Sequence, residues 1–160
     1  MPATAPFTIS EATWRDLFPI QALEHECFGE DAWVLLEMLG VLTFSGVVRL
    51  KAVGYGGVLV GFIAGDMRGK DGAGWIMTVG VTRAYRRLGV AKALMAACEQ
   101  VMRLPVVKLT VRTSNLSAIA LYEKLGYTRS KVWPKYYHNG EDGLVMKREI
   151  PRTELEEDVR

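Results

Sequence analysis

A short turn rich in arginine and glycine, set between two apolar segments, most constrains how this chain can fold. Its residues are Tyr85-Arg86-Arg87-Leu88-Gly89-Val90-Ala91. The run at 74–81 predicts a strand before the turn, and the periodicity of 89–102 predicts an amphipathic helix after it. Backbone N–H groups at a helix start lack acceptors, and the helix dipole favours an anion there. Gly89 allows close backbone approach and the arginines suit phosphate oxygens, so the turn predicts a polyphosphate cofactor.

The remaining pattern alternates strands with helices and predicts an α/β fold. We expect strands at 7–9, 49–53, 58–66, 74–81, 106–111, 127–136 and 144–147. We expect helices from Glu11, capped by Ser10, to Gly29, and at 33–42, 89–102 and 117–124. The glycine-rich turn at 54–57 and the Asp71-Gly72 turn predict that the second, third and fourth strands form an antiparallel meander. On the 89–102 helix, the expected buried positions are Val90, Ala91, Leu94, Met95, Cys98 and Val101.

Length, composition and charge limit the class of protein to which this chain can belong. The chain of 160 residues is 49% hydrophobic, which predicts one domain over 1–150, followed by a flexible tail at 151–160. A net charge of +2 gives no argument for a nucleic-acid partner. Cys27 and Cys98 imply no disulfide framework, so we expect a reducing, cytoplasmic location. We expect no membrane partner, because no membrane span or signal peptide is visible. Two cysteines and two histidines without ligand spacing predict no metal site.

A second motif follows the turn at an informative distance. It consists of Ser114-Asn115 and then Ala120-Leu121-Tyr122-Glu123-Lys124-Leu125-Gly126-Tyr127. With the turn before it, this order resembles the GCN5-related N-acetyltransferase (GNAT) superfamily over about residues 7–150. The resemblance implies a mixed, mostly antiparallel sheet of six or seven strands with helices on both faces. It also implies that the sheet splays between its fourth and fifth strands, where the cofactor acetyl-CoA binds.

Two further segments narrow the resemblance. They are Trp75-Ile76-Met77-Thr78-Val79-Gly80-Val81 and Pro134-Lys135-Tyr136-Tyr137-His138-Asn139-Gly140-Glu141-Asp142-Gly143. Both are similar to protein N-terminal acetyltransferases, including ribosomal-protein alanine acetyltransferases and the catalytic subunits of co-translational enzymes. The resemblance implies acetyl transfer from acetyl-CoA to the α-amine of a protein or peptide, by direct attack in a ternary complex. It further implies a monomer or homodimer, with an auxiliary subunit as a further partner.

The resemblance also implies roles for individual residues. The backbone of Arg87, Leu88, Gly89, Val90 and Ala91 would hold the CoA pyrophosphate, with side-chain charge from Arg86 and Arg87. The strand residues Met77, Val79 and Val81 would lie along the pantetheine, and Asn115 would fix the cofactor from the other side. Tyr122 would protonate the sulfur of CoA as a general acid. Phe28, Tyr136 and Tyr137 would form the walls of the peptide entrance, although two successive strand residues point to opposite faces, so one tyrosine could simply pack.

The chain departs from the family pattern at the general base. Relatives often place Glu or His at the position of Thr110, or Tyr at that of Trp75, and neither residue here is a usable base. An α-amine is roughly a quarter neutral at pH 7.4, whereas a lysine amine is only about 0.1% neutral. The missing base therefore favours an α-amine over lysine as the nucleophile. Glu30 in the first loop, or Glu141 and Asp142 near the paired tyrosines, could take the proton through water, and Glu30 is our first candidate.

Two other functions remain open at this point. The first is an acetyltransferase for a small amine, which usually needs acidic residues to hold a polycation. The second is a catalytically weak acyl-CoA-binding module, since the missing base could mean that partner contacts matter more than turnover. Plain nucleotide binding by the arginine–glycine turn is excluded, because the chain lacks the lysine of a P-loop and magnesium ligands.

Overall fold

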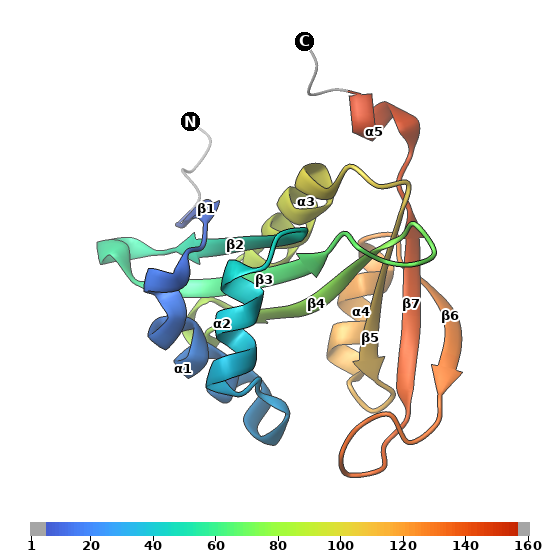
Figure 1. Cartoon of the computed structure of the whole chain (residues 1–160), viewed down its shortest axis with the longest axis horizontal. Coiled ribbons are helices and arrows are strands. Elements are labelled where there is room, and N and C mark those ends of the chain that lie inside the picture. Colours follow the sequence, from blue (N-terminus) through green and yellow to red (C-terminus); the bar gives the residue numbers. More distant parts are fainter. Residues whose placement is uncertain (1–5, 157–160) are drawn as a thin grey trace.

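Seven strands form one mixed sheet in the order β1-β2-β3-β4-β5-β7-β6 in the computed structural model, which describes residues 6–156 (Figure 1). The strands are β1 Thr8–Glu11, β2 Val47–Val53, β3 Leu59–Asp66, β4 Gly74–Val81, β5 Val106–Arg112, β6 Thr128–Trp133 and β7 Gly143–Glu149. The α-helices are α1 Leu17–Phe28, α2 Leu35–Thr43, α3 Val90–Met102, α4 Leu116–Lys124 and α5 Arg152–Glu156. Four short 3-10 turns are η1 Trp14–Asp16, η2 Gly29–Asp31, η3 Tyr55–Gly57 and η4 Arg83–Tyr85.

The sheet consists of two antiparallel parts joined by one short parallel pair. β1 to β4 form the expected meander, and β7 pairs with both β5 and β6. β4 and β5 run parallel and pair only at Gly74–Val107, Trp75–Lys108 and Ile76–Leu109. Beyond these pairs the two strands diverge, as Figure 1 shows. The predicted α/β fold and the splay between the fourth and fifth strands are confirmed.

Helices cover both faces of the sheet (Figure 1). α1 and α2 bury Ile20, Leu23 and Met38 in one apolar cluster with Phe62 of β3. On the other face, α3 and α4 contribute to a larger cluster that includes Leu94. Because successive strand residues point to opposite faces, β3 supplies both clusters from neighbouring positions.

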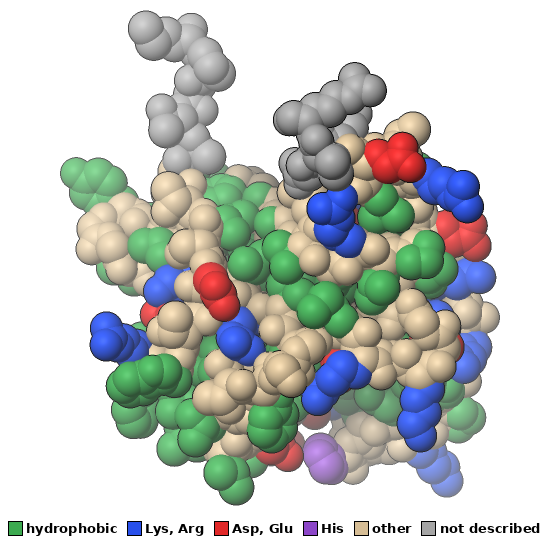
Figure 2. Space-filling view, turned by 45° about the horizontal axis from the view of Figure 1, so that its top comes forward, with side chains coloured by type: hydrophobic (Ala, Val, Ile, Leu, Met, Phe, Trp, Pro, Cys, Tyr) green, Lys and Arg blue, Asp and Glu red, His purple; other side chains and the backbone are tan. Residues whose placement is uncertain are grey.

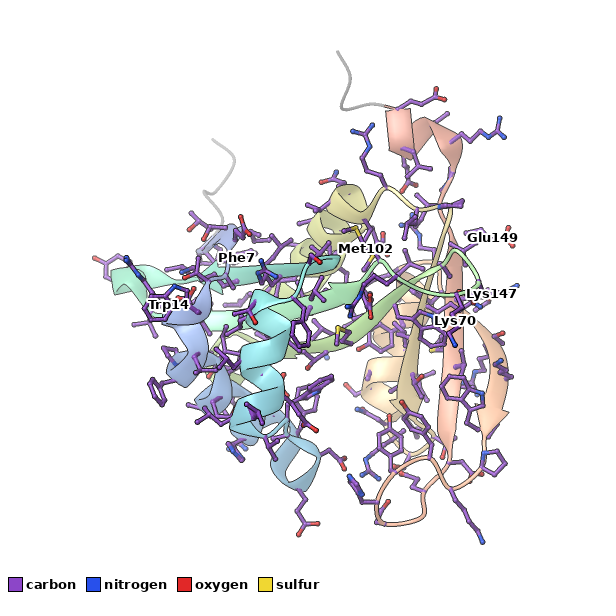
Figure 3. All side chains as sticks on the ribbon, viewed as in Figure 1. Phe7, Trp14, Lys70, Met102, Lys147 and Glu149 are labelled. Carbon is purple, nitrogen blue, oxygen red and sulfur yellow. The ribbon has the colours of Figure 1, made fainter. Side chains whose placement is uncertain are left out.

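The buried face of α3 differs from the predicted set mainly at Val101, while Ala91 is partly buried and Glu99 is buried as well. Val90, Leu94, Met95 and Cys98 are buried as expected, but Val101 is 53% exposed. Met102 is buried in its place and contacts the sheet near the α3–β5 junction (Figure 3). Spacing alone allowed either residue, because positions i+3 and i+4 both follow Cys98 on the same side of a helix.

The predicted helix start at Ser10 and Glu11 is wrong. Both residues belong to β1, where Ser10 pairs with Lys51 of β2. Thr13 instead begins η1, with a capping box to Asp16, and α1 starts at Leu17. Trp14 therefore lies outside the helix, 62% exposed, at the edge of the molecule far from β5, β6 and β7 (Figure 3).

Two other segments differ from the sequence-based expectation. The strand predicted over 127–136 ends at Trp133, and Lys135 adopts a left-handed backbone with φ of 51°. In the expected tail, Arg152–Glu156 forms α5, whose Glu154 pairs with Arg148 at 2.9 Å. The last four residues of that tail, 157–160, lie outside the described residues.

Charged side chains of both signs are scattered among hydrophobic and other groups on the face drawn in Figure 2. Figure 2 shows Lys and Arg gathered on the side of the molecule formed by β6 and β7. Arg129 of β6 pairs with Glu123 at 3.0 Å, and Arg148 of β7 pairs with Glu154. In residues 6–156, no helix has the length and apolar character needed to cross a membrane.

Gly61 of β3 lets the start of α3 pack directly on the sheet. A Cβ added there would lie 3.0 Å from both Leu94 Cδ1 and Val90 Cγ1, and both side chains are fully buried. We expect Gly61→Ala to lower the free energy of unfolding by about 1–2 kcal/mol, since overpacking outweighs the entropic gain from replacing glycine. Urea unfolding measures this change, and a variant as stable as the wild type would contradict the tight contact.

Candidate active site

A cleft of about 490 Å³ opens where β4 and β5 diverge. Its walls come from both parts of the sheet, from α1 and η2 on one side, and from α4 and the β6–β7 loop on the other. The residues that line it are Glu24, Phe28, Asp31, Trp33, Trp75, Ile76, Met77, Thr78, Val79, Leu109, Thr110, Val111, Arg112, Asn115, Ala118, Tyr122, Trp133, Tyr136 and Tyr137. Segments distant in the sequence therefore meet here because of the splay.

The β4 wall carries a bulge. Ala64 pairs with Thr78 and Gly65 with Ile76, so Met77 is an extra residue without a partner on β3. A bulge of this kind bends a strand and re-aims its groups, and bulges are frequent beside active sites. Met77 and Val79 line the cleft, whereas Val81, predicted with them, is buried at the strand end and does not.

The arginine–glycine turn has the backbone geometry of an anion cradle. Arg87 and Gly89 adopt positive φ values of 66° and 81°, and α3 begins immediately afterwards at Val90. Within residues 6–156, no backbone carbonyl accepts from the N–H groups between Arg87 and Lys92. Successive free N–H groups in such a conformation form a concave anion site, so these residues fit a pyrophosphate.

One side chain of this turn is already engaged. Arg86 Nε donates to the carbonyl oxygen of Val81 at 3.0 Å and thereby ties the turn to the end of β4. Leu88 is half exposed and Ala91 is partly buried on the first turn of α3. The charge of Arg87 is exposed beside the free N–H groups.

Asn115 and Tyr122 reach the cleft from α4. Asn115 is the N-cap of this helix, and its Oδ1 accepts from the N–H of Ala118 at 3.2 Å. Tyr122 is 9% exposed, and its ring packs against Tyr127 with 6.0 Å between centroids. Burial raises the pKa of Tyr122 to about 12, so its hydroxyl stays protonated at neutral pH and can donate a proton.

Tyr136 and Tyr137 both line the cleft, and the argument that one of two successive strand residues must face away does not apply to them. They lie in the β6–β7 loop rather than on a strand, and their rings meet edge to face at 5.0 Å. The loop is closed by bonds from Lys135 N to Asp142 Oδ1 at 2.9 Å and from Tyr137 N to the Glu141 carbonyl at 3.1 Å. Phe28, at the end of α1, lines the cleft from the opposite side.

Arg112 at the end of β5 connects the two sides of this entrance. Its guanidinium forms an ion pair with Asp31 of η2 and a longer one with Glu141 of the β6–β7 loop at 3.4 Å. The same guanidinium lies 4.1 Å from the ring centroid of Tyr137. One cation thus neutralises two carboxylates and positions an aromatic wall.

Both positions where relatives often carry a base do face the cleft. Thr110 lines it from β5 and Trp75 from β4, where the indole stacks on Trp133 at 5.6 Å. Neither side chain accepts a proton near neutral pH. The ring of Trp133 also packs against the ring of Tyr136, with 5.3 Å between centroids. Trp75, Trp133 and Tyr136 therefore form an aromatic row along this wall.

The structure does not bring Glu30 into the cleft lining. Glu30 is exposed in η2, next to Asp31, which does line the cleft. Sequence reasoning missed Glu24, which is 2% exposed and lines the cleft from α1. A signal for Glu24 existed, because helical spacing places it on the same face as the buried Ile20 and Leu23.

Neither cysteine is activated. Burial raises the pKa of Cys98 to about 12 and also raises the pKa of Cys27. The thiolate is the nucleophilic form, so neither side chain suits an acyl-enzyme intermediate. Residues 6–156 contain no cluster of three or more His, Cys, Asp and Glu that could hold a metal ion.

Comparison with known proteins agrees with this architecture. Residues 11–127 match the family described as Acetyltransferase (GNAT) family. The catalytic subunit NAA10 of the N-terminal acetyltransferase A complex of Arabidopsis thaliana is 35% identical over 149 residues, which cover 89% of this chain and 77% of that protein. Ard1 from Thermoplasma volcanium superposes with a TM-score of 0.80 at 25% identity, covering 91% of this chain and 99% of that one.

A further solved structure shares the fold. NAA60 of Arabidopsis thaliana, in complex with acetyl-CoA, has a TM-score of 0.79 at 19% identity, with 90% of this chain and 98% of that one covered. The family match covers most of the chain, and the splayed sheet and the turn before α3 are present in the structure. The chain is therefore an N-acetyltransferase of the GNAT family.

Proposed function

We propose that this enzyme transfers an acetyl group from acetyl-CoA to the α-amine of a protein or peptide N-terminus, by direct attack in a ternary complex. The observation that carries the proposal is the single cleft that brings Tyr122 of α4 together with the paired tyrosines of the β6–β7 loop. The similarity to NAA10, an N-terminal acetyltransferase subunit, supports the same substrate class.

The residues of the cofactor side fit acetyl-CoA, which would supply a thioester carbonyl to the amine. The free N–H groups from Arg87 to Ala91, with the charge of Arg87, would hold the pyrophosphate. Met77, Val79 and Asn115 would contact the pantetheine arm, and the bulged edge of β4 would pair with it as an added strand does. Val81 would have an indirect role, because its carbonyl oxygen accepts the hydrogen bond that holds the Arg86 side chain in place.

Tyr122 would hold the proton that the departing sulfur needs. Its raised pKa keeps the O–H intact, and its burial against Tyr127 fixes the ring. Direct attack is favoured over an acyl-enzyme because the pKa of each cysteine is raised by burial. Free cysteines also suit a reducing compartment, so the proposal places the enzyme in the cytoplasm, with an auxiliary subunit as a further partner.

The charges of the entrance favour a peptide over a polycationic small amine. Asp31 and Glu141, which could attract a polycation, are both paired with Arg112. The same cleft carries the aromatic row from Trp75 to Tyr136, which suits the side chain and backbone of a peptide's first residues.

A panel of acceptors tests this proposal. We expect α-amines of short peptides to be acetylated at least 100-fold more efficiently, as kcat/KM, than the lysine of a peptide whose N-terminus is blocked. Polyamines and aminoglycoside-type amines should be equally poor, and mass spectrometry of the peptide products would locate the acetyl group. Preferential acetylation of small polyamines would overturn the peptide assignment, while acetyl-CoA binding without transfer to any amine would indicate a binding module.

A further inference from the structure

The cleft contains one carboxyl group that the roles described above do not use. Glu24 sits in the middle of α1, 2% exposed, on the face of the helix that packs against β4. Its Oε1 accepts from the hydroxyl of Thr78 at 2.6 Å, and Thr78 is itself buried. Its Oε2 is buried and makes no hydrogen bond to any described residue. Unpartnered carboxylate oxygens inside a protein are costly and call for an explanation.

A purely structural role does not account for both oxygens. Joining α1 to β4 requires only one acceptor, which Oε1 provides to Thr78. A glutamine would make the same bond without burying a charge. The carboxyl group therefore destabilises the fold relative to its isosteric amide, a pattern common where the group serves function.

The surroundings of Glu24 hold its position without neutralising it. Gln21, one turn earlier in α1, donates to the carbonyl oxygen of Trp33 at 2.7 Å and fixes the loop above the cleft. Burial raises the pKa of Glu24, and the hydrogen bond from the Thr78 hydroxyl opposes the rise. A carboxylate with a raised pKa is a stronger base than one in water.

The other charged groups near α1 are engaged elsewhere. On α1 itself, His25 bonds to Gln21, Glu26 bonds to Thr82 and the Arg83 N–H, and Cys27 bonds to the Val81 carbonyl. On η1, η2, α2 and β3, which pack against α1, each of the following carboxylates has its own partner: Asp16 with Lys51, Asp31 with Arg112, Glu37 with the Val34 N–H, and Asp66 with Arg68. Arg15 of η1 lies over the ring of Trp14, Glu30 of η2 is exposed, and β4 offers only Thr78 and no ionisable side chain. None of the described cations pairs with Glu24.

We infer that Glu24 is the general base of this acetyltransferase, taking the place of the residues missing at Thr110 and Trp75. The inference rests on the proposed function. Glu24 Oε2 takes one proton from the α-ammonium, directly or through one water, and releases it to solvent. The lone pair of the neutral amine then forms the C–N bond. Tyr122 gives its proton to sulfur as the C–S bond breaks with its electron pair, and the surplus proton on the new amide nitrogen restores the tyrosine.

The first test is Glu24→Gln, which keeps the bond from Thr78 and removes the basic oxygen. We expect kcat on a good peptide to fall about 100-fold. In the wild type, the fall of kcat at low pH should follow protonation of the Glu24 carboxyl. In Glu24→Gln this fall should shift to higher pH, toward the pKa of the substrate amine. Acetyl-CoA affinity, measured by calorimetry, should stay within twofold. Glu37→Gln, a charge removal on the exposed face of α2, is the matched control and should leave the rate and profile unchanged.

Two readouts without turnover separate catalysis from structure. A carboxyl whose pKa is raised by folding costs stability as pH rises through the interval from about 4.5 to the folded value. Glu24→Gln should therefore match or exceed the wild-type melting temperature at pH 7.5, and a loss of stability together with activity would overturn the inference. In addition, carbon-13 NMR of labelled glutamate should show two carboxyls titrating above the others, one from Glu99 and one that is absent in Glu24→Gln. The lack of a raised signal that disappears in Glu24→Gln would also overturn the inference.

Glu30→Gln is the competing variant. If Glu30→Gln removes the acid limb and Glu24→Gln keeps wild-type kcat, the base is Glu30 and the inference about Glu24 fails. If the wild-type protein acetylates no peptide α-amine, the proposed function fails instead. These results are distinguishable because the wild-type rate is measured first.

Discussion

Replacing Tyr122 by Phe is expected to lower kcat about 1,000-fold while leaving acetyl-CoA affinity within twofold of the wild type. The variant keeps the ring that packs on Tyr127 and loses only the O–H of this cleft-lining residue. A positioned acid typically contributes 10²–10⁴ in rate, and here no other acid on α4 lines the cleft in the described residues. Steady-state kinetics with a good peptide and calorimetric titration with acetyl-CoA measure the two quantities.

A neighbouring tyrosine provides the matched control for this variant. Tyr127 packs on Tyr122 but does not line the cleft, and its hydroxyl donates to Glu99 at 2.6 Å. Tyr127→Phe should keep kcat within about twofold and lower the free energy of unfolding by about 1–3 kcal/mol, since a buried carboxyl loses its hydrogen bond. A Tyr122→Phe enzyme with a near wild-type kcat would show that Tyr122 is not the acid.

The largest expected effect on stability comes from Arg148→Met. Arg148 of β7 pairs with the buried Glu99 of α3 and, more exposed, with Glu154 of α5. Removing the cation leaves Glu99 charged in the interior, which typically costs about 3–5 kcal/mol. For a domain of this size the melting temperature should fall by about 10 °C, as differential scanning calorimetry would measure.

The pH dependence of this loss identifies its cause. Burial raises the pKa of Glu99, and Tyr127 and Arg148 oppose that rise. Without Arg148 the folded-state pKa rises further, so stability is lost as pH increases from about 4.5 through that value. The deficit of Arg148→Met should therefore be smaller at pH 4.5 than at pH 8. The double variant Arg148→Met/Glu99→Gln should recover most of the stability, and failure to recover would mean that the arginine stem, not its charge, is responsible.

The elements that the sequence predicts well are those specified by local pattern. The periodicity of α3, the glycine turns of the meander and the turn before α3 each depend on nearby residues. The start of α1 was missed because Ser10 and Thr13 are both good caps, and the choice between them depends on pairing between Ser10 and the distant Lys51.

The sequence indicated the cleft residues that belong to local motifs and did not indicate those that depend on packing. Asn115, Tyr122 and the tyrosine pair were found from their segments, and the structure brings them to one cleft. Glu24 was missed because its importance arises only when α1 lies on β4 and places Thr78 against one carboxyl oxygen. The tyrosine loop was mistaken for a strand because its closure depends on Asp142 binding the N–H of Lys135, with the left-handed φ of Lys135.

The short parallel pair between β4 and β5 also determines how unfolding and binding are coupled. The chain up to α3 builds one part of the sheet and the chain from β5 onward builds the other, and only three residue pairs join their strands. A ligand in the cleft touches both parts and therefore acts as a clamp between them. At 100 times its dissociation constant it adds about 2.7 kcal/mol to the cost of separating them. The saturated enzyme should thus behave as one cooperative unit, with its two parts most independent when both substrates are absent.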